Sequence, residues 1–337
     1  MSTPAGLRTR LTERFGLGTP VLNAPMALVA GGVLAGAVTR AGGLGFIGGG
    51  YAGTLGREPE LSTEFDLAAG QRVGVGFITW ALDRAPSLLD AAVALQPAVV
   101  FLSFGDPQPH AARIHAAGVP LICQVQRLAD IPPALHAGAM AIVVQGTEAG
   151  GHGGARATFP FVPEAADYLA AHSPETLLLA AGGIADGRGL AAALMLGADG
   201  VVIGTRLWAA HEALTQDAAL ARAFPASGDD TIRTRAVDAL RDVPWPADYS
   251  FRVLRNALTD TWAHREGDAF AARGSLQADY DAARQRADYD MVVAVAGEAV
   301  GQLHQREAAG DILARITQDA ILALARGSSG DFRSARG

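Results

Sequence analysis

The chain alternates short apolar runs with longer alanine-rich segments. Each run is too short for a buried helix, and most are rich in Val, Ile, Leu or Phe, as strands covered on both faces are. The pattern therefore predicts eight buried strands. They occupy residues 21–26, 44–49, 72–78, 98–105, 120–125, 140–146, 177–184 and 200–205.

The segments between these runs have the composition of helices. Residues 32–42, 106–118, 127–138 and 186–197 are rich in alanine, and each ends in glycine, which is a common helix stop. This alternation favours an α/β fold of the (β/α)8 type, the TIM barrel. A doubly wound, Rossmann-like sheet is the structural alternative.

The pattern changes after Thr205. Residues 1–207 are predicted to form the barrel, and residues 208–292 an inserted, mostly helical lid subdomain whose helical stretches are punctuated by proline and tryptophan. Residues 293–326 are expected to form C-terminal helices that return to the barrel. Residues 327–337 are expected to form a flexible tail.

Charge and hydropathy exclude two classes of partner. The formal net charge is −7 without a basic cluster, so binding to nucleic acid or to an anionic membrane surface is not expected. Residues 21–39 carry no charge, but Asn23, Pro25 and a glycine pair interrupt them. This stretch is therefore interpreted as a buried strand, turn and helix rather than a membrane span, and we expect a cytoplasmic protein.

Two residue types are nearly or wholly absent. Cys123 is the only cysteine, which excludes an internal disulfide bond and a cysteine-based zinc site, and fits a reducing compartment. All 27 basic residues are arginine. Enzymes that form a Schiff base on lysine are excluded for this reason. Nothing in the composition indicates an oligomeric state.

Glycines follow the last two predicted strands. Gly182 and Gly183 end the seventh, and Gly204 and Thr205 end the eighth. In (β/α)8 barrels the chemistry lies at the carboxyl ends of the strands, and a phosphate is often held after strands seven and eight. Glycines let backbone N–H groups approach an anion, and threonine adds a hydroxyl. We therefore predict a phosphate site here, with two structural turns as the simpler alternative.

Other strand ends carry groups that suit a flat ring. Pro25 fixes the backbone after the first strand, and the thioether of Met26 suits contact with a ring, although a methionine is more often ordinary core. The amide of Gln124, at the end of the fifth strand, both donates and accepts hydrogen bonds. Such a group suits the polar edge of an isoalloxazine ring.

One histidine stands apart from the other seven. His152 lies in Val143–Ala155, where five glycines surround it directly after the sixth predicted strand. Gly150 and Gly151 let the backbone pass close to a ligand while His152 projects over the barrel mouth. No His, Cys or Asp stands at metal-ligand spacing from it, so we expect no metal and a role in proton transfer or substrate orientation.

Several segments together resemble the nitronate monooxygenase family, formerly called 2-nitropropane dioxygenases. They are NAPM at 23–26, QGTEAGGHGG at 145–154, GGIADGRGLAAALMLGADGVVIGTR at 182–206, and RTRAVDAL with its following PWP at 233–246. The resemblance extends from about Leu11 to Arg326. It implies an FMN-binding barrel with a helical second domain.

The resemblance also implies a role for each candidate residue. His152 is implied to be the active-site base or orienting group. The implied contacts of the FMN phosphate are Gly182, Gly183, Gly204 and Thr205, and the residues that bracket its ring are Ala24, Pro25, Met26, Gln124 and Gln145, with Gly150 and Gly151 in the adjoining loop.

The implied reaction is oxidation of an alkyl nitronate by dioxygen to a carbonyl compound and nitrite, with electron transfer to the flavin. With a neutral nitroalkane, the histidine first removes the α-proton. The expected partners are therefore a small nitronate or nitroalkane and dioxygen.

Two positions depart from relatives in this family. Gln124 stands where some relatives carry lysine, and Gly153 lacks the side chain that often follows the histidine. An FMN-dependent NAD(P)H:quinone or enoyl reductase on the same scaffold is the alternative enzyme. A flavin- or phosphate-binding module without catalysis is the alternative of another class.

Overall fold

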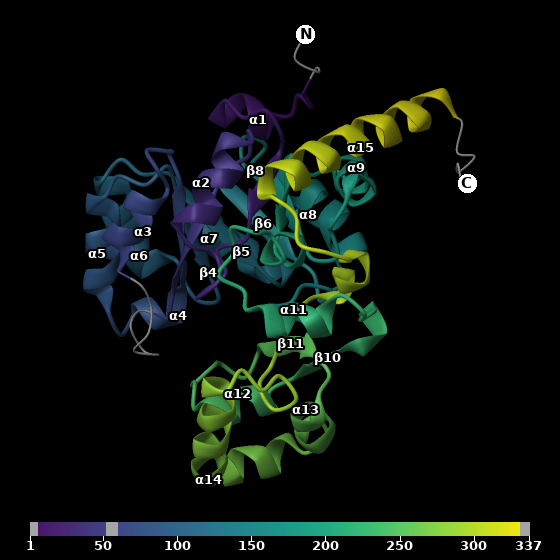
Figure 1. Ribbon diagram of the computed structural model, residues 1–337. Helices are drawn as coiled ribbons and strands as arrows, with labels where there is room; N and C mark the ends of the chain where they lie inside the picture. The colour runs from purple at the N-terminus through teal and green to yellow at the C-terminus, as the bar shows by residue number, and fades with distance from the viewer. Residues whose placement is uncertain (1–5, 52–59, 331–337) are drawn as a thin grey trace.

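The computed structural model describes residues 6–51 and 60–330. Its larger part is a barrel of eight parallel strands surrounded by helices (Figure 1). The strand order is β1-β9-β8-β6-β5-β4-β3-β2, and a bridge between Leu22 and Leu44 brings the two ends of the sheet together. The predicted (β/α)8 barrel is confirmed and the doubly wound sheet is excluded. The strands are β1 (Val21–Asn23), β2 (Phe46–Gly50), β3 (Gly74–Ile78), β4 (Val100–Ser103), β5 (Leu121–Val125), β6 (Ala141–Gln145), β8 (Leu177–Ala181) and β9 (Gly200–Ile203).

Helices cover the outer face of this sheet. The last helix, α15 (Ala309–Ser329), returns to the barrel and packs against α9 and α2. It includes residues 327–329 of the predicted tail, and residues 331–337 lie outside the described residues. The other barrel helices are α1 (Arg10–Phe15), α2 (Gly32–Arg40), α3 (Leu61–Leu67), α4 (Thr79–Leu82), α5 (Pro86–Ala94), α6 (Gln108–Ala116), η1 (Leu128–Asp130), α7 (Ile131–His136), α8 (Thr158–His172) and α9 (Gly187–Met195).

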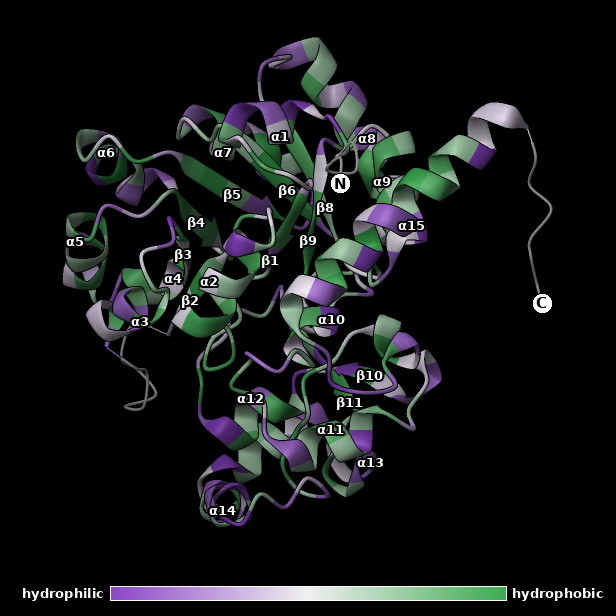
Figure 2. Ribbon diagram, turned by 45° about the horizontal axis from the view of Figure 1, so that its top comes forward, coloured by the Kyte–Doolittle hydropathy of each residue, from purple (hydrophilic) through white to green (hydrophobic). Residues whose placement is uncertain are grey.

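Side chains of the barrel strands alternate between two apolar layers. In β4, Phe101 points into the barrel interior, where its ring meets Phe46 edge-on at a centroid distance of 5.4 Å. Val100 and Leu102 pack instead in the layer beneath the helices. The strands are correspondingly hydrophobic along their length (Figure 2). Burial on both faces explains why they read as continuous apolar runs in the sequence.

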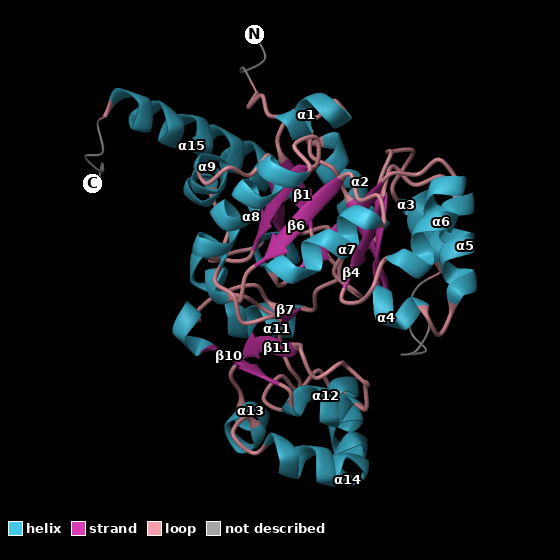
Figure 3. Cartoon of the chain, turned by 180° about the vertical axis from the view of Figure 1, so that it is seen from behind, coloured by secondary structure: helices cyan, strands magenta, loops and turns pink. Residues whose placement is uncertain are grey.

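A second subdomain lies against the end of the barrel at which the strands finish (Figure 3). It is mostly helical, as predicted, but it also contributes to a three-stranded antiparallel sheet in the order β10-β11-β7. The elements from the end of the barrel onward are α10 (Thr205–Trp208), α11 (Asp217–Ala223), η2 (Gly228–Asp230), β10 (Thr231–Thr234), α12 (Ala236–Arg241), β11 (Ser250–Leu254), α13 (Ala257–Trp262), α14 (Glu266–Gln285) and η3 (Glu298–Gln302).

The small sheet was not predicted from the sequence. Arg233 and Arg252 face each other across β10 and β11, and they interrupt the apolar pattern by which strands are recognised. The third strand, β7 (Gly151–Gly153), comes from the loop after β6 of the barrel. The segment that carries His152 is therefore hydrogen-bonded into the second subdomain. None of the described helices combines the length and the apolar character that a membrane span needs.

Candidate active site

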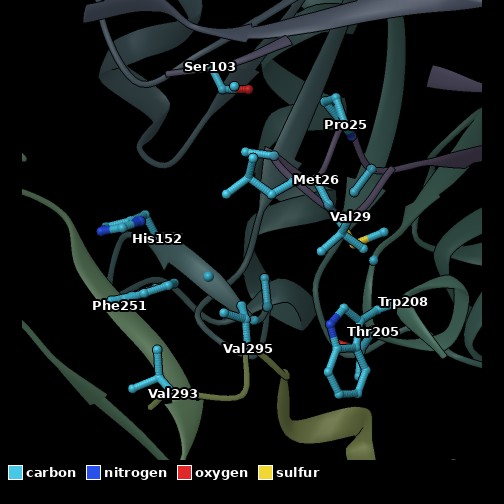
Figure 4. A pocket seen from close by; sticks show the side chains of 18 of the residues that line it. Pro25, Met26, Val29, Ser103, His152, Thr205, Trp208, Phe251, Val293 and Val295 are labelled. Atoms are coloured by element: carbon cyan, nitrogen blue, oxygen red, sulfur yellow. The ribbon is translucent and has the colours of Figure 1, made fainter. Parts of the chain in front are cut away.

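A cavity lies between the carboxyl ends of the barrel strands and the second subdomain. Its volume is about 410 Å³, within the usual range of small-molecule sites. Figure 4 shows His152 and Phe251 on one side of it and Met26, Val29 and Trp208 on the other. The structure brings all the predicted site residues to its wall, namely Ala24, Pro25, Met26, Gln124, Gln145, Gly150, Gly151, His152, Gly182, Gly183, Gly204 and Thr205.

The turn after β1 is held rigidly at the barrel mouth. Asn23 is fully buried, and its side-chain amide donates to the carbonyl of Phe46 and accepts from the N–H of Phe46, at 2.9 and 2.7 Å. Pro25 lies so close to β3 that a Cβ atom at Gly76 would be 2.3 Å from the Cβ of the proline. The position of Pro25 and Met26 against the cavity is thus fixed from two neighbouring strands.

The two glycines after β8 form a cradle with unused donors. Gly182 and Gly183 have φ angles of +103° and +73°, a region that L side chains rarely adopt. Their backbone N–H groups donate to no acceptor among the described residues. Thr205 Oγ1 accepts a hydrogen bond from Gly297 N–H at 2.9 Å, so its hydroxyl hydrogen stays free to donate. This donor set fits a phosphate group.

The two glutamines at the cavity differ in their hydrogen bonds. Gln145 is buried, donates to the carbonyl of His152 at 3.1 Å and accepts from Gln126 Nε2 at 2.9 Å. The amide of Gln124 has no hydrogen-bond partner among the described residues and lines the cavity. Gln145 therefore supports the His152 segment, whereas Gln124 is free to bind a ligand.

His152 forms a buried pair with Asp238 from helix α12. Its Nε2 lies 2.9 Å from Asp238 Oδ1, and the two side chains are only 4% and 2% exposed. A carboxylate accepts hydrogen bonds, so Nε2 carries the hydrogen and Nδ1 keeps the lone pair. Nδ1 has no hydrogen bond to another described residue. This pair is chemically suited to accept a proton at Nδ1.

Two aromatic rings enclose the imidazole. Trp245 stacks on His152 at a centroid distance of 3.4 Å with an interplanar angle of 9°, and Phe251 stacks at 4.2 Å with an angle of 7°. Phe251 is also the register partner of His152 in the small sheet. The rings fix the plane of the imidazole and keep water away from it.

The loop before His152 is held by arginines of the small sheet. Arg233 donates to the carbonyls of Ala149 and Gly153, and Arg252 donates to the carbonyl of Thr147, at 3.0 to 3.2 Å and 2.9 Å. These bonds satisfy carbonyls that a glycine-rich loop leaves without partners. The second subdomain thereby holds the loop in one conformation.

Burial lowers the pKa of His152 from 6.5 to about 4, and this effect outweighs the neighbouring Asp238 charge, which raises it. The imidazole is therefore neutral at pH 7. A neutral imidazole can accept a proton, which is the state that a general base requires.

This shift predicts that acid destabilises the protein through His152. Between pH 6.5 and pH 4 the His152 side chain is protonated in the unfolded chain but remains neutral in the native protein. The free energy of unfolding therefore falls by up to about 3 kcal/mol as the pH drops through this range. Urea unfolding of the wild type and of His152→Asn at pH 7, 5.5 and 4.5 measures the effect. The difference between the two proteins should change with pH, and parallel profiles would contradict the assignment.

Sequence reasoning missed Asp238, Trp245 and Phe251. Asp238 and Trp245 belong to the RTRAVDAL and PWP segments that carry the family resemblance. The sequence does not show, however, that both side chains lie beside His152. No group of three His, Cys, Asp or Glu side chains suited to a metal occurs among the described residues.

Residues 71–319 match the family model described as nitronate monooxygenase. The chain is 32% identical to the nitronate monooxygenase of Neurospora crassa over 339 residues, which covers 89% of this chain and 88% of the relative. It is also 34% identical over 254 residues to the (3aS,4S,5R,7aS)-5-hydroxy-7a-methyl-1-oxo-octahydro-1H-indene-4-carboxyl-CoA dehydrogenase of Mycobacterium tuberculosis, covering 75% of this chain and 68% of the relative.

A solved structure of FabK from Thermotoga maritima is similar over most of the fold. Its TM-score is 0.81 at 27% sequence identity, and the match covers 96% of this chain and 99% of FabK. The likeness therefore includes the second subdomain as well as the barrel.

Proposed function

Since the chain belongs to the nitronate monooxygenase family and is an oxidoreductase, we propose that it uses FMN to oxidise alkyl nitronates, and neutral nitroalkanes, with dioxygen. The products are carbonyl compounds and nitrite. The observation that carries the proposal is the neutral, aromatic-enclosed His152, held by Asp238 beside a cavity with a phosphate-type donor set.

FMN fits the residues that line the cavity. The free N–H groups of Gly182 and Gly183 and the hydroxyl of Thr205 would hold its phosphate, and the free amide of Gln124 would bind its ring. When bound, FMN supplies an electron acceptor for the nitronate.

The protein's own contribution to a neutral substrate is proton removal. His152 Nδ1 takes the α-proton of the nitroalkane, and Asp238 stabilises the imidazolium through Nε2–H. The rings of Trp245 and Phe251 exclude water, so the proton passes to the imidazole rather than to solvent. With a preformed nitronate this step is unnecessary.

Asp238→Asn should impair this step while keeping the side-chain shape. The amide can donate to Nε2, which moves the hydrogen to Nδ1 and removes the lone pair that accepts the proton. We expect turnover of nitroethane to fall at least about a hundredfold, and turnover of ethyl nitronate much less. Nitrite release from the two substrates measures this. The matched control is Asp242→Asn, which should leave both rates unchanged. Asp242 is exposed, has a left-handed backbone conformation and follows helix α12 directly.

The proposed reaction itself is tested by products. Purified FMN-loaded enzyme, supplied with ethyl nitronate in air, should release nitrite and acetaldehyde in equal amounts without NAD(P)H. Absence of nitrite from this and from longer nitronates would contradict the proposed function.

An NAD(P)H-dependent reductase is the second candidate. The specific observation in its favour is the likeness to FabK over nearly the whole of both chains. Oxidation of NADH by the FMN-loaded enzyme, with a quinone or an enoyl thioester as acceptor, would favour this candidate.

A further inference from the structure

Arg241 is an arginine of the cavity wall without a carboxylate partner among the described residues. It is the last residue of helix α12, and its guanidinium lies over the rings of Phe251 and Tyr51, at 5.3 and 5.5 Å from their centroids. Its hydrogen bond to the hydroxyl of Tyr51 is long, at 3.5 Å from Nη2. The guanidinium therefore has donors that the described residues do not use.

Three other arginines of this region are compensated. Arg252 forms an ion pair with Glu298 at 2.9 Å, Arg206 pairs with Glu307, and Arg233 donates to several backbone carbonyls. A buried cation is stable only when a counter-charge or a full set of acceptors accompanies it. Among the described residues, Arg241 has neither an ion pair nor a full set of acceptors, and nor does Arg235, which lies over the ring of Phe270 with its Nε unpaired. Of these two arginines, only Arg241 lines the cavity.

Asp238 is a charge that acts on Arg241 through space, although no ion pair joins the two side chains. Asp238 lies three residues earlier on the same helix, but its Oδ1 binds His152, and its second oxygen, Oδ2, has no hydrogen-bond partner. The guanidinium thus keeps unused N–H donors at the wall of the cavity in which the substrate is proposed to bind, with Asp238 as a neighbouring charge.

We propose that Arg241 is the anion-binding residue of the substrate pocket and holds the planar oxyanion of a nitronate or carboxylate group. This inference rests on the proposed function. A nitronate carries its charge on two oxygens in one plane, which matches the two parallel N–H donors of a guanidinium. Phe251 contacts both Arg241 and His152, so an anion held by the arginine lies near the base.

Arg241 consequently selects for charge. A nitronate gains the ion pair with the guanidinium, whereas a neutral nitroalkane of the same shape gains only hydrogen bonds. Small carboxylates have the same planar geometry and should compete with nitronates for the site. The residue acts in binding, and proton transfer remains with His152.

The test uses the FMN-loaded enzyme with propionate as the anion probe. Propionate binding is followed by the quenching of tryptophan fluorescence, since Trp245 and Trp208 line the cavity. We expect Arg241→Gln to weaken propionate binding at least about tenfold and to raise the KM for ethyl nitronate similarly, with kcat for ethyl nitronate nearly unchanged. The KM for nitroethane should stay nearly unchanged, and its kcat should fall because the nitro oxygens gain negative charge as the proton leaves. Arg241→Lys should restore part of the affinity because it keeps the charge.

Arg265→Gln is the matched control. Arg265 also lies over an aromatic ring, that of Trp262, but it is exposed and already paired with Asp268. It should bind propionate as the wild type does. Thermal melts of all variants separate a loss of anion binding from a loss of fold.

The outcomes separate the two proposals. Wild-type affinity for propionate in Arg241→Gln overturns the anion site, as does a change confined to FMN affinity or flavin potential, which would assign Arg241 to the cofactor. If the wild type oxidises no nitronate but binds propionate through Arg241, the proposed function fails and the anion site stands.

Discussion

His152→Asn is expected to lower the turnover of nitroethane by about 10² to 10⁴-fold while that of ethyl nitronate changes less than about tenfold. The neutral substrate needs Nδ1 of the imidazole as proton acceptor, and asparagine offers no group of comparable basicity. The nitronate has already lost this proton. Initial rates of nitrite release at equal FMN content measure how much more the variant loses on nitroethane than on ethyl nitronate.

The control for this variant is His136→Asn, at an exposed histidine of helix α7 that does not line the cavity. It should leave both rates unchanged. Equal losses on both substrates in His152→Asn would contradict the role as a base and would indicate substrate orientation instead. Unchanged rates on both would remove His152 from the chemistry.

Gly183→Asp is expected to abolish FMN binding in a folded protein. Its φ of +73° is one that Asp and Asn tolerate better than other L residues, and a Cβ there meets only Glu148, at 3.4 Å. The added carboxylate would stand in the proposed phosphate cradle and repel the phosphate. The purified protein should be colourless, with a far-ultraviolet dichroism spectrum like that of the wild type.

Gly183→Asn separates charge from size, because its side chain has nearly the same shape without the charge. It should retain a measurable part of the FMN affinity, determined by titration of the cofactor-free protein. An unaltered FMN affinity in Gly183→Asp would show that the phosphate lies elsewhere. Equal loss in both variants would attribute the effect to filling the cradle.

The barrel could be predicted from the sequence because each of its strands has a recognisable local pattern. Strands buried on both faces, such as β4 and β6, appear as continuous apolar runs. The cradle was accessible because a barrel places Gly183 and Thr205 at the ends of adjacent strands, a geometry that the fold imposes. Once the fold is known, these positions follow from residue order.

The pairing of His152 with Asp238 was not accessible in the same way. The two residues are 86 positions apart and are joined by a helix of the second subdomain and a three-stranded sheet. Apolar periodicity does not reveal β10 and β11, since Arg233 and Arg252 occupy positions within them. The stacking of Trp245 and Phe251 on the imidazole depends on that sheet, so it too could be found only in three dimensions.

Nitronate oxidation is tested most directly by the visible spectrum of the FMN-loaded protein without oxygen. The spectrum is recorded before and after addition of an alkyl nitronate such as propionate 3-nitronate, with NADH in a parallel sample. The nitronate is expected to remove the absorbance band of oxidised flavin, and NADH is expected to leave it unchanged. Loss of the band with NADH alone would contradict nitronate oxidation and identify a reductase.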